Sequence, residues 1–265
     1  MNEFEFVRPT SLGEAVQALR GGEDHKLLGG GQSLIPILKL GLAQPRRLVS
    51  LVDVPELRGV KRDGGELVLG AATTHAEVAT SKVVRDSIAA LTTLADSIGD
   101  AQVRNRGTIG GSIAHSDPAA DYPAAILALN AKIVTDRRVI AADDFFKGMF
   151  ETALAADEII TAVRFQVPKA AAYAKMPNPA SRFAIVGVMV ARGVDGAVRV
   201  GVTGAAATPF RATAMEQALA KRFAADALEG VTIPDDELVS DMHAGPAYRA
   251  HLVGVMARRA VAALG

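Results

Sequence analysis

Two glycine-rich segments are the first candidates for chemistry in this sequence. One is Leu28-Gly29-Gly30-Gly31-Gln32-Ser33-Leu34, and the other is Arg104-Asn105-Arg106-Gly107-Thr108-Ile109-Gly110-Gly111-Ser112. Glycine lets the backbone approach a ligand closely and adopt positive φ, so successive N–H groups can converge on an anion. The hydroxyls of Ser33, Thr108 and Ser112 can add hydrogen bonds to phosphate oxygens. A single segment of this kind is also typical of a tight surface turn, but two in one chain suit the two phosphates of a dinucleotide.

Neither segment follows a common phosphate-binding motif. The sequence contains no Gly-Lys-Ser or Gly-Lys-Thr, so it lacks a P-loop. Neither segment has the GxGxxG order between a strand and a helix, which disfavours a Rossmann site. The residues alone therefore indicate a nucleotide or dinucleotide held by an unusual pair of loops, and they do not name it.

The rest of the composition excludes several other kinds of site. The chain of 265 residues has no cysteine, which excludes disulfides, a cysteine nucleophile, a thiolate zinc site and an iron–sulfur cluster held by this chain. Its five histidines include no two at metal-ligand spacing, so no metal site is expected. Lys plus Arg equals Asp plus Glu at 29 each, and Trp is absent, so no nucleic-acid partner is expected.

Membrane insertion and secretion are not expected either. The longest apolar run, residues 183–191, is about half the length needed to span a bilayer. The first residues are acidic and lack an apolar signal region. We therefore expect a cytoplasmic protein without stable membrane insertion.

The elements that must position the two glycine segments are a mixture of short strands and helices, which predicts an α+β fold. The helix period and the capping residues predict a helix at 10–20 and mainly helix at 74–100. We expect residues 104–121 to form a glycine-rich loop region. Strands are predicted at 47–52, 66–70, 159–167, 184–191 and 198–204, followed by helices at 213–224 and 247–264. A domain boundary is expected near 168–174.

Three motifs, taken together, resemble a known family. They are Gly29-Gly30-Gly31-Gln32-Ser33-Leu34-Ile35-Pro36, Gln102-Val103-Arg104-Asn105-Arg106-Gly107-Thr108-Ile109-Gly110-Gly111 and Ala114-His115-Ser116-Asp117-Pro118-Ala119-Ala120-Asp121. In this order they resemble the medium FAD-binding subunit of molybdenum hydroxylases, the relatives of carbon monoxide dehydrogenase and xanthine dehydrogenase. Gly70-Ala71-Ala72-Thr73-Thr74, Tyr173-Ala174-Lys175 and Thr208-Pro209-Phe210-Arg211-Ala212 extend the resemblance across the chain.

The resemblance implies a fold and a cofactor. It implies a two-part FAD-binding domain of the vanillyl-alcohol-oxidase/PCMH type at residues 1–170, with subdomains at about 1–55 and 56–170. A C-terminal domain with a three-stranded antiparallel sheet and helices is implied at 171–265. The cofactor would be an extended FAD clamped between the two N-terminal pieces.

The resemblance also implies site residues. The pyrophosphate would be held by Gly29, Gly30, Gly31, Gln32 and Ser33 of the first segment, and by Thr108, Ile109, Gly110, Gly111 and Ser112 of the second, and Gly107 would also contact the cofactor. Leu28 and Leu34 would flank the cofactor, and Ala72 and Ile98 would lie beside it. Asp121 would contact the adenosine half, Ile159 or Ile160 the ring system, and Lys175 would be the cationic neighbour of the flavin.

Several nearby polar residues have two interpretations. His115 is either a cofactor contact or a buried histidine bonded to backbone, and Arg104 and Arg106 either bind phosphate or form surface or subunit contacts. We interpret His75 as structural. Asp117 is interpreted as a turn cap beside Pro118, the usual role of Asp there.

The implied role is electron transfer with no catalytic side chain on this chain. A large partner subunit would carry a molybdenum pterin and a small one two [2Fe–2S] clusters, in a dimer of heterotrimers. Carbon monoxide dehydrogenases tend to carry His at Gln32 and Asp at Ser112, so an aldehyde, N-heterocycle or purine is favoured over carbon monoxide. The alternatives are a stand-alone FAD-dependent reductase or oxidase and an FAD-free assembly subunit. The sequence does not specify the substrate or the electron acceptor (NAD, oxygen, a quinone or a protein).

Overall fold

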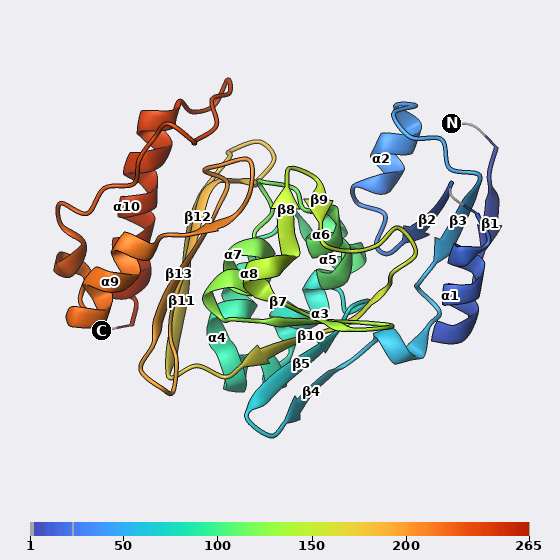
Figure 1. Cartoon of the computed structure of the whole chain (residues 1–265), viewed down its shortest axis with the longest axis horizontal. Helices are drawn as coiled ribbons and strands as arrows, with labels where there is room; N and C mark the ends of the chain where they lie inside the picture. The colour runs from blue at the N-terminus through green and yellow to red at the C-terminus, as the bar shows by residue number, and fades with distance from the viewer. Residues whose placement is uncertain (1–2, 23, 265) are drawn as a thin grey trace.

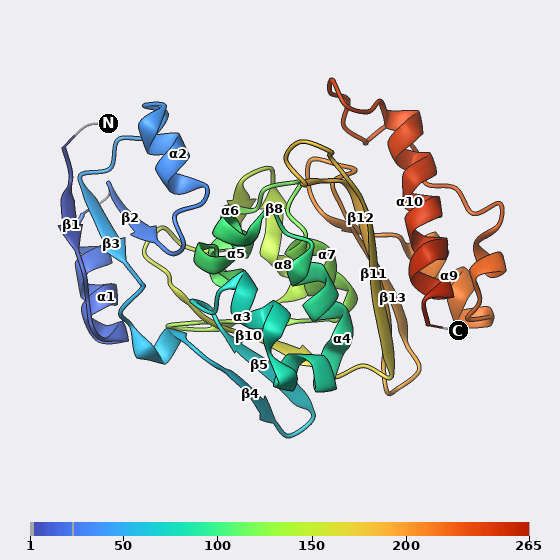
Figure 2. The same ribbon diagram turned by 180° about the vertical axis from the view of Figure 1, so that it is seen from behind.

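The computed structural model describes residues 3–22 and 24–264 and has three sections that lie in a row. Figures 1 and 2 show the N-terminal section at one end, a central sheet with its helices in the middle, and a second sheet with two helices at the other end. Together they form the α+β architecture expected from the sequence. Each section has its own cluster of buried apolar side chains.

The N-terminal section is a small parallel sheet with two helices. Its strand order is β1-β3-β2, and its elements are β1 (Glu5–Val7), α1 (Leu12–Arg20), β2 (His25–Leu28), α2 (Leu34–Lys39) and β3 (Arg47–Ser50). Helix α1 begins where the Ser11 side chain accepts a hydrogen bond from the Glu14 N–H, and it buries Ala15 and Leu19. The core of this section also includes Ala72 and Ile159 from the central section. The two sections therefore share apolar packing.

The central section contains a five-stranded antiparallel sheet of order β4-β5-β10-β6-β7. After the short helix η1 (Pro55–Leu57), its strands are β4 (Val60–Asp63), β5 (Glu66–Gly70), β6 (Lys132–Thr135), β7 (Val139–Ala141) and β10 (Ile160–Gln166). The helices between β5 and β6 are α3 (His75–Thr80), α4 (Lys82–Asp96), α5 (Ala101–Arg106), α6 (Ile109–His115) and α7 (Tyr122–Ala128). Helix α8 (Ala142–Phe145) and the hairpin β8 (Phe146–Gly148) and β9 (Glu151–Thr152) precede β10.

The helical region from 74 to 115 differs from the prediction in two ways. The predicted helix at 74–100 is divided at Ser81, which caps α4, and α4 itself has non-helical φ/ψ at Ile88. The loop predicted at 104–121 is wrong for much of its length, because α5 extends to Arg106 and α6 follows. Asp100 and Thr108 cap these two helices. Glycine lowers helix propensity, but tertiary packing of Gly110 and Gly111 overrides that preference here.

The C-terminal section is an antiparallel sheet covered by helices. Its long strands β11 (Ala170–Pro177), β12 (Ala184–Arg192) and β13 (Val198–Thr203) form the expected three-stranded sheet, and the two-residue β14 (Phe210–Arg211) extends its edge. Helices α9 (Thr213–Lys221), η2 (Ala225–Leu228) and α10 (Pro246–Ala262) cover the outer face, while α4 and α7 lie on the inner side (Figures 1 and 2).

The long apolar run of the sequence is explained by this arrangement. All residues of β12 except the last are buried, because both faces of the strand are covered. No helix in the described part of the chain is long and apolar enough to span a bilayer.

Candidate functional site

A cavity of about 670 Å³ lies between the N-terminal and central sections. Its volume is within the range of roughly 300–1,000 Å³ that is common for ligand sites. Residues from the segment 25–34 form one wall, residues from 107–121 a second, and residues from 152–160 a third, without every residue of each segment taking part. Residues 181–183, from the loop that links β11 to β12, complete the lining.

The first glycine segment leaves β2 and enters α2 at the edge of this cavity. Among residues 3–22 and 24–264, none accepts a hydrogen bond from the backbone N–H groups of residues 29–33. Gly31 has a φ of 76°, a conformation that glycine adopts without strain. The Ser33 side chain makes no capping bond, so its hydroxyl is also available. A run of unpaired amides next to a cavity can bind an anion.

This segment also packs tightly against the second glycine segment. A Cβ atom at Gly30 would overlap the carbonyl oxygen of Arg106 and lie 2.6 Å from the Cα of Gly107. A Cβ atom at Gly29 would lie 3.1 Å from the Thr108 Oγ1. The two segments, far apart in the sequence, therefore meet in a contact that excludes any larger residue at Gly30.

The second glycine segment uses its amides in a different way from the expectation. The N–H groups of Gly107 and Gly110 donate to the carbonyls of Val103 and Ala71, at 2.8 and 2.9 Å. The Ile109 N–H donates to the Thr73 carbonyl. The Gly111 N–H donates to the Thr108 hydroxyl, and the Ser112 N–H donates to the Thr108 carbonyl. These five amides are therefore already hydrogen-bonded within the chain. The segment contributes close backbone approach and the Ser112 side chain to the cavity wall.

His75 is a buried polar residue that lines the cavity. Its side chain is 5% exposed, and its ring lies 5.4 Å from that of Tyr122. Within the described residues, neither the His75 Nδ1 nor the Tyr122 hydroxyl has a hydrogen-bond partner. Burial, with a smaller effect of Arg104, lowers the pKa of His75 from 6.5 to about 4, so the ring is neutral at pH 7. His75, interpreted as structural from the sequence, therefore also forms part of the cavity wall.

Asp121 lines the cavity at the start of α7 and is held from behind by Tyr173 and Lys175. The Tyr173 hydroxyl donates to Asp121 Oδ1 at 2.6 Å, and the Lys175 ammonium donates to the same oxygen at 2.8 Å. Lys175 also donates to the carbonyls of Ser97 and Arg182, both at 2.9 Å. Burial raises the pKa of Asp121, and the lysine and tyrosine oppose that effect.

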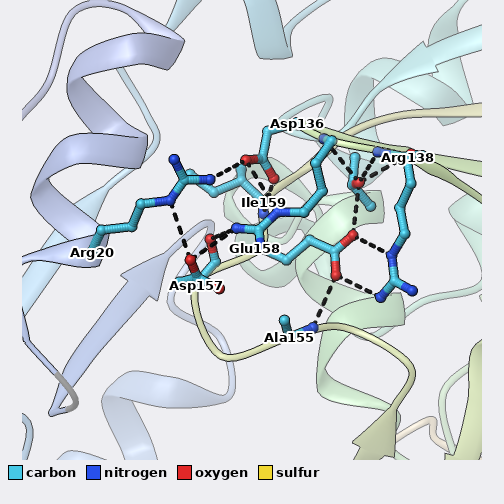
Figure 3. A network of polar contacts seen from close by, with 9 residues as sticks. Arg20, Asp136, Arg138, Ala155, Asp157, Glu158 and Ile159 are labelled. Atoms are coloured by element: carbon cyan, nitrogen blue, oxygen red, sulfur yellow. Dashed lines mark hydrogen bonds and ion pairs between the residues drawn. The ribbon is translucent and has the colours of Figure 1, made fainter.

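The third wall is held by charged groups, which Figure 3 shows from close by. The Glu158 carboxylate accepts two hydrogen bonds from Arg138, at 2.8 and 2.7 Å, one from Thr135 and one from the Ala155 N–H. These bonds, those from Arg138 above all, lower the pKa of Glu158 to about 2. Glu158 is therefore a fixed anion within the wall.

Most of the residues expected at the site come together around the cavity. Those that line it are Gly29, Gly30, Gly31, Gln32, Ser33, Leu34, Ala72, Ile98, Gly107, Thr108, Gly110, Gly111, Ser112, His115, Asp121 and Ile160. The His115 ring packs against Phe150, with centroids 5.0 Å apart. Asp117 caps its turn as expected, accepting from the Ala119 N–H at 2.8 Å. Arg104 donates to the carbonyls of Ile98 and Gly99.

Four of the expected residues do not line the cavity. Ile109 and Ile159 are fully buried in the apolar cores. Leu28 is the last residue of β2, and its side chain lies beside Gly31. Lys175 binds Asp121, which lines the cavity, and is not itself part of the lining. Other lining residues, such as Leu19, Lys26, Leu51 and Leu154, were not expected from the sequence, because isolated residues on strands and helices carry no motif. No group of three or more His, Asp or Glu side chains within 3–22 and 24–264 is arranged to hold a metal ion.

Comparisons with known proteins identify similar families. A family described as the FAD binding domain in molybdopterin dehydrogenase matches residues 2–170. A second family, the CO dehydrogenase flavoprotein C-terminal domain, matches residues 171–264.

Individual proteins are similar over nearly the whole chain. The carbon monoxide dehydrogenase medium chain of Hydrogenophaga pseudoflava is 37% identical over 277 residues, covering 97% of this chain and 96% of that one. The nicotine 6-hydroxylase medium subunit of Paenarthrobacter nicotinovorans is 33% identical over 275 residues, covering 99% and 97%. A solved structure of carbon monoxide dehydrogenase from Hydrogenophaga pseudoflava, lacking the Mo-pyranopterin moiety of its cofactor, matches with a TM-score of 0.88 and 36% identity, covering 99% and 97%.

Proposed function

The chain belongs to the family of FAD-binding medium subunits of molybdenum-dependent dehydrogenases, and from this premise we propose that it is the electron-transfer component of such an enzyme. In this role it accepts electrons from the [2Fe–2S] clusters of a small partner subunit and passes them to an external acceptor. The substrate is oxidised at a molybdenum pterin on a large partner subunit. The complex is a dimer of heterotrimers in the cytoplasm.

The observation that carries the proposal is the run of amides at residues 29–33, unpaired within the described part of the chain, beside a cavity of about 670 Å³. These five consecutive N–H groups suit the pyrophosphate of FAD, because an unpaired donor needs an acceptor or water. Ser33 and Ser112 also line the cavity, and their hydroxyls can add further donors. Any cofactor of this kind is held mainly by backbone, which explains the glycines at these positions.

The remaining lining fits the other parts of FAD. Apolar side chains from both sections, including Leu34, Ile98 and Ile160, provide surface for the ring systems. Asp121, fixed by Tyr173 and Lys175, presents a polar group that can accept a hydrogen bond from the adenosine half. When bound, FAD supplies the ability to take up two electrons and to release them to a different acceptor.

The side chains of this chain bind and orient the cofactor and exclude water from it. We assign no catalytic acid or base here. Lys175 acts on the cofactor through Asp121, since its ammonium is already surrounded by three acceptors. In the neutral form, His75 contributes a polar ring without adding charge to the cavity wall.

The substrate of the whole enzyme is proposed to be an aldehyde, an N-heterocycle or a purine in preference to carbon monoxide. Gln32 and Ser112, which line the cavity, depart from the residues expected in a carbon monoxide dehydrogenase. Relatives act on different molecules, as the names carbon monoxide dehydrogenase and nicotine 6-hydroxylase indicate. We also propose that the chain divides into an FAD-binding domain at 1–170, with subdomains at about 1–55 and 56–170, and a C-terminal domain at 171–265.

The first experiment is the visible absorption spectrum of the chain purified with added FAD, with and without its partner subunits. We expect the bands of oxidised flavin, and we expect them to be lost when residues 29–33 are replaced by a loop with side chains. A colourless protein that ignores FAD even with its partners would contradict the proposal and favour an assembly role. Flavin binding without copurification of two partner chains would favour a stand-alone reductase or oxidase.

A further inference from the structure

A cluster of charged side chains joins the N-terminal section to the third wall of the cavity. We call it the Arg20 cluster, and it consists of Arg20, Asp136, Arg137 and Asp157 (Figure 3). Arg20, the last residue of α1, donates to Asp136 at 3.1 Å and to Asp157 at 3.2 Å. One guanidinium on the first section therefore binds two carboxylates of the central section.

Asp136 transmits this contact to the backbone of the wall. Its Oδ1 accepts a hydrogen bond from the Ile159 N–H at 2.9 Å, and its own N–H donates to the Ile159 carbonyl, also at 2.9 Å. The Asp136 side chain is 6% exposed, so its carboxylate relies on hydrogen-bonding partners within the protein in place of water. The position of Ile159 is thus coupled to the position of Arg20.

The coupled residues are direct sequence neighbours of the cavity lining. Leu19 precedes Arg20, and Glu158 and Ile160 flank Ile159; all three line the cavity. Glu158 is held separately, by Arg138 and Thr135. The third wall is therefore held by the β6–β7 turn of the central section and by α1 of the N-terminal section. Movement of α1 away from Asp136 would widen the cavity between Leu19 and Ile160.

We propose that Arg20 is a positioning residue that holds the two walls of the cavity at a fixed separation and thereby slows the release of bound FAD. The proposal rests on the proposed function for its ligand, but the contact itself is a property of the chain alone. Arg20 is 48% exposed, so its ion pairs are weakened by salt. Arg20 holds the walls because it binds the carboxylates of Asp136 and Asp157 at the same time, and Asp136 is buried.

The first test is amide hydrogen exchange on the chain without FAD. In Arg20→Met, Arg137 at 3.6 Å is the one cation left to Asp136 among the residues that the structure describes. We expect the amides of residues 154–160 to exchange about tenfold faster, a factor that corresponds to about 1.4 kcal/mol, while the amides of β12 are unchanged. Arg8→Met is the matched control, because Arg8 forms an ion pair with Asp53 within the same section. Unchanged exchange at 154–160 in Arg20→Met would overturn the proposal.

The second test is the rate of FAD release from the assembled protein, followed by flavin fluorescence. We expect release to be about tenfold faster in Arg20→Met, with Arg20→Lys in between and Arg8→Met like the original chain. High salt should accelerate release from the original chain and have little further effect on Arg20→Met. If all four proteins release FAD at one rate, Arg20 is not a positioning residue although the FAD function stands. If the original chain binds no FAD, the proposed function fails, and the exchange experiment alone decides the role of Arg20.

Discussion

Replacing Gly30 by alanine is predicted to abolish tight cofactor binding while the chain still folds. The added methyl group would overlap the Arg106 carbonyl and approach the Gly107 Cα to 2.6 Å, and both obstacles are backbone. The first glycine segment must therefore move away from the second, at a cost of about 1–3 kcal/mol in stability. The displaced amides of residues 29–33 would then miss the pyrophosphate. Loss of one or two charge-assisted hydrogen bonds, at about 1.5–3 kcal/mol each, weakens FAD binding by about 10-fold for one bond at the low end to about 20,000-fold for two at the high end.

The assay is titration with FAD, followed by quenching of flavin fluorescence, with partner subunits present. Gly13→Ala is the control, because a Cβ atom at Gly13 in α1 meets nothing within 4 Å. We expect the control to keep the original dissociation constant within about twofold, since exposed sites rarely change energies by more than about 0.5 kcal/mol. A folded Gly30→Ala chain, checked by circular dichroism, that binds FAD as tightly as the control would refute the packing argument.

Three further predictions concern the buried charged and polar groups. The pKa of His75 falls from 6.5 to about 4 on folding, so its ring should show no titration by NMR between pH 5.5 and 8. The free energy of unfolding should be at its full value above pH 6.5 and should decrease by about 3 kcal/mol as the pH falls toward 4. Titration of the ring near pH 6.5 would contradict this. Glu158 has a lowered pKa, so the original chain should melt at a higher temperature than Glu158→Gln at pH 7. This difference in melting temperature should decline as the pH falls from 4.5 to about 2. A difference that grows in acid would rule out the ion pair between Glu158 and Arg138. Lys175→Met leaves Asp121 buried without its cation and should lower the free energy of unfolding in urea by about 3–5 kcal/mol. Adding Asp121→Asn to this variant should restore part of the loss. If the effects of the two substitutions are simply additive, the pair does not interact.

Much of the fold could be predicted from local patterns. Thr10 and Ser11 were both possible caps for the helix predicted at 10–20, and Ser11 caps it; Thr74 caps a helix as its type indicates. A turn at residues 63–65, which are rich in glycine, joins β4 to β5. The two long strands β12 and β13 follow from β-branched apolar runs around a glycine turn. The helices α5 and α6 could not be predicted in the same way, because their glycines have low helix propensity and only the packing of Gly110 against Ala71 reveals why glycine is there.

The sequence by itself determined the family, the α+β class and the two glycine segments that border the cavity, because these depend on residue types and their order. Only the tertiary structure decided which segment keeps its amides available. The Gly107 N–H donates to a carbonyl of the preceding helix α5, and the Gly110 N–H donates to the distant Ala71 carbonyl. The N–H groups of residues 29–33 have no such acceptor within the described residues. Only the tertiary structure directed Lys175 to Asp121 and brought Arg20 to Asp136 and Asp157, 116 and 137 residues away. Hydrogen-bond partners and buried charges depend on neighbours in space, and no local pattern in the chain specifies them.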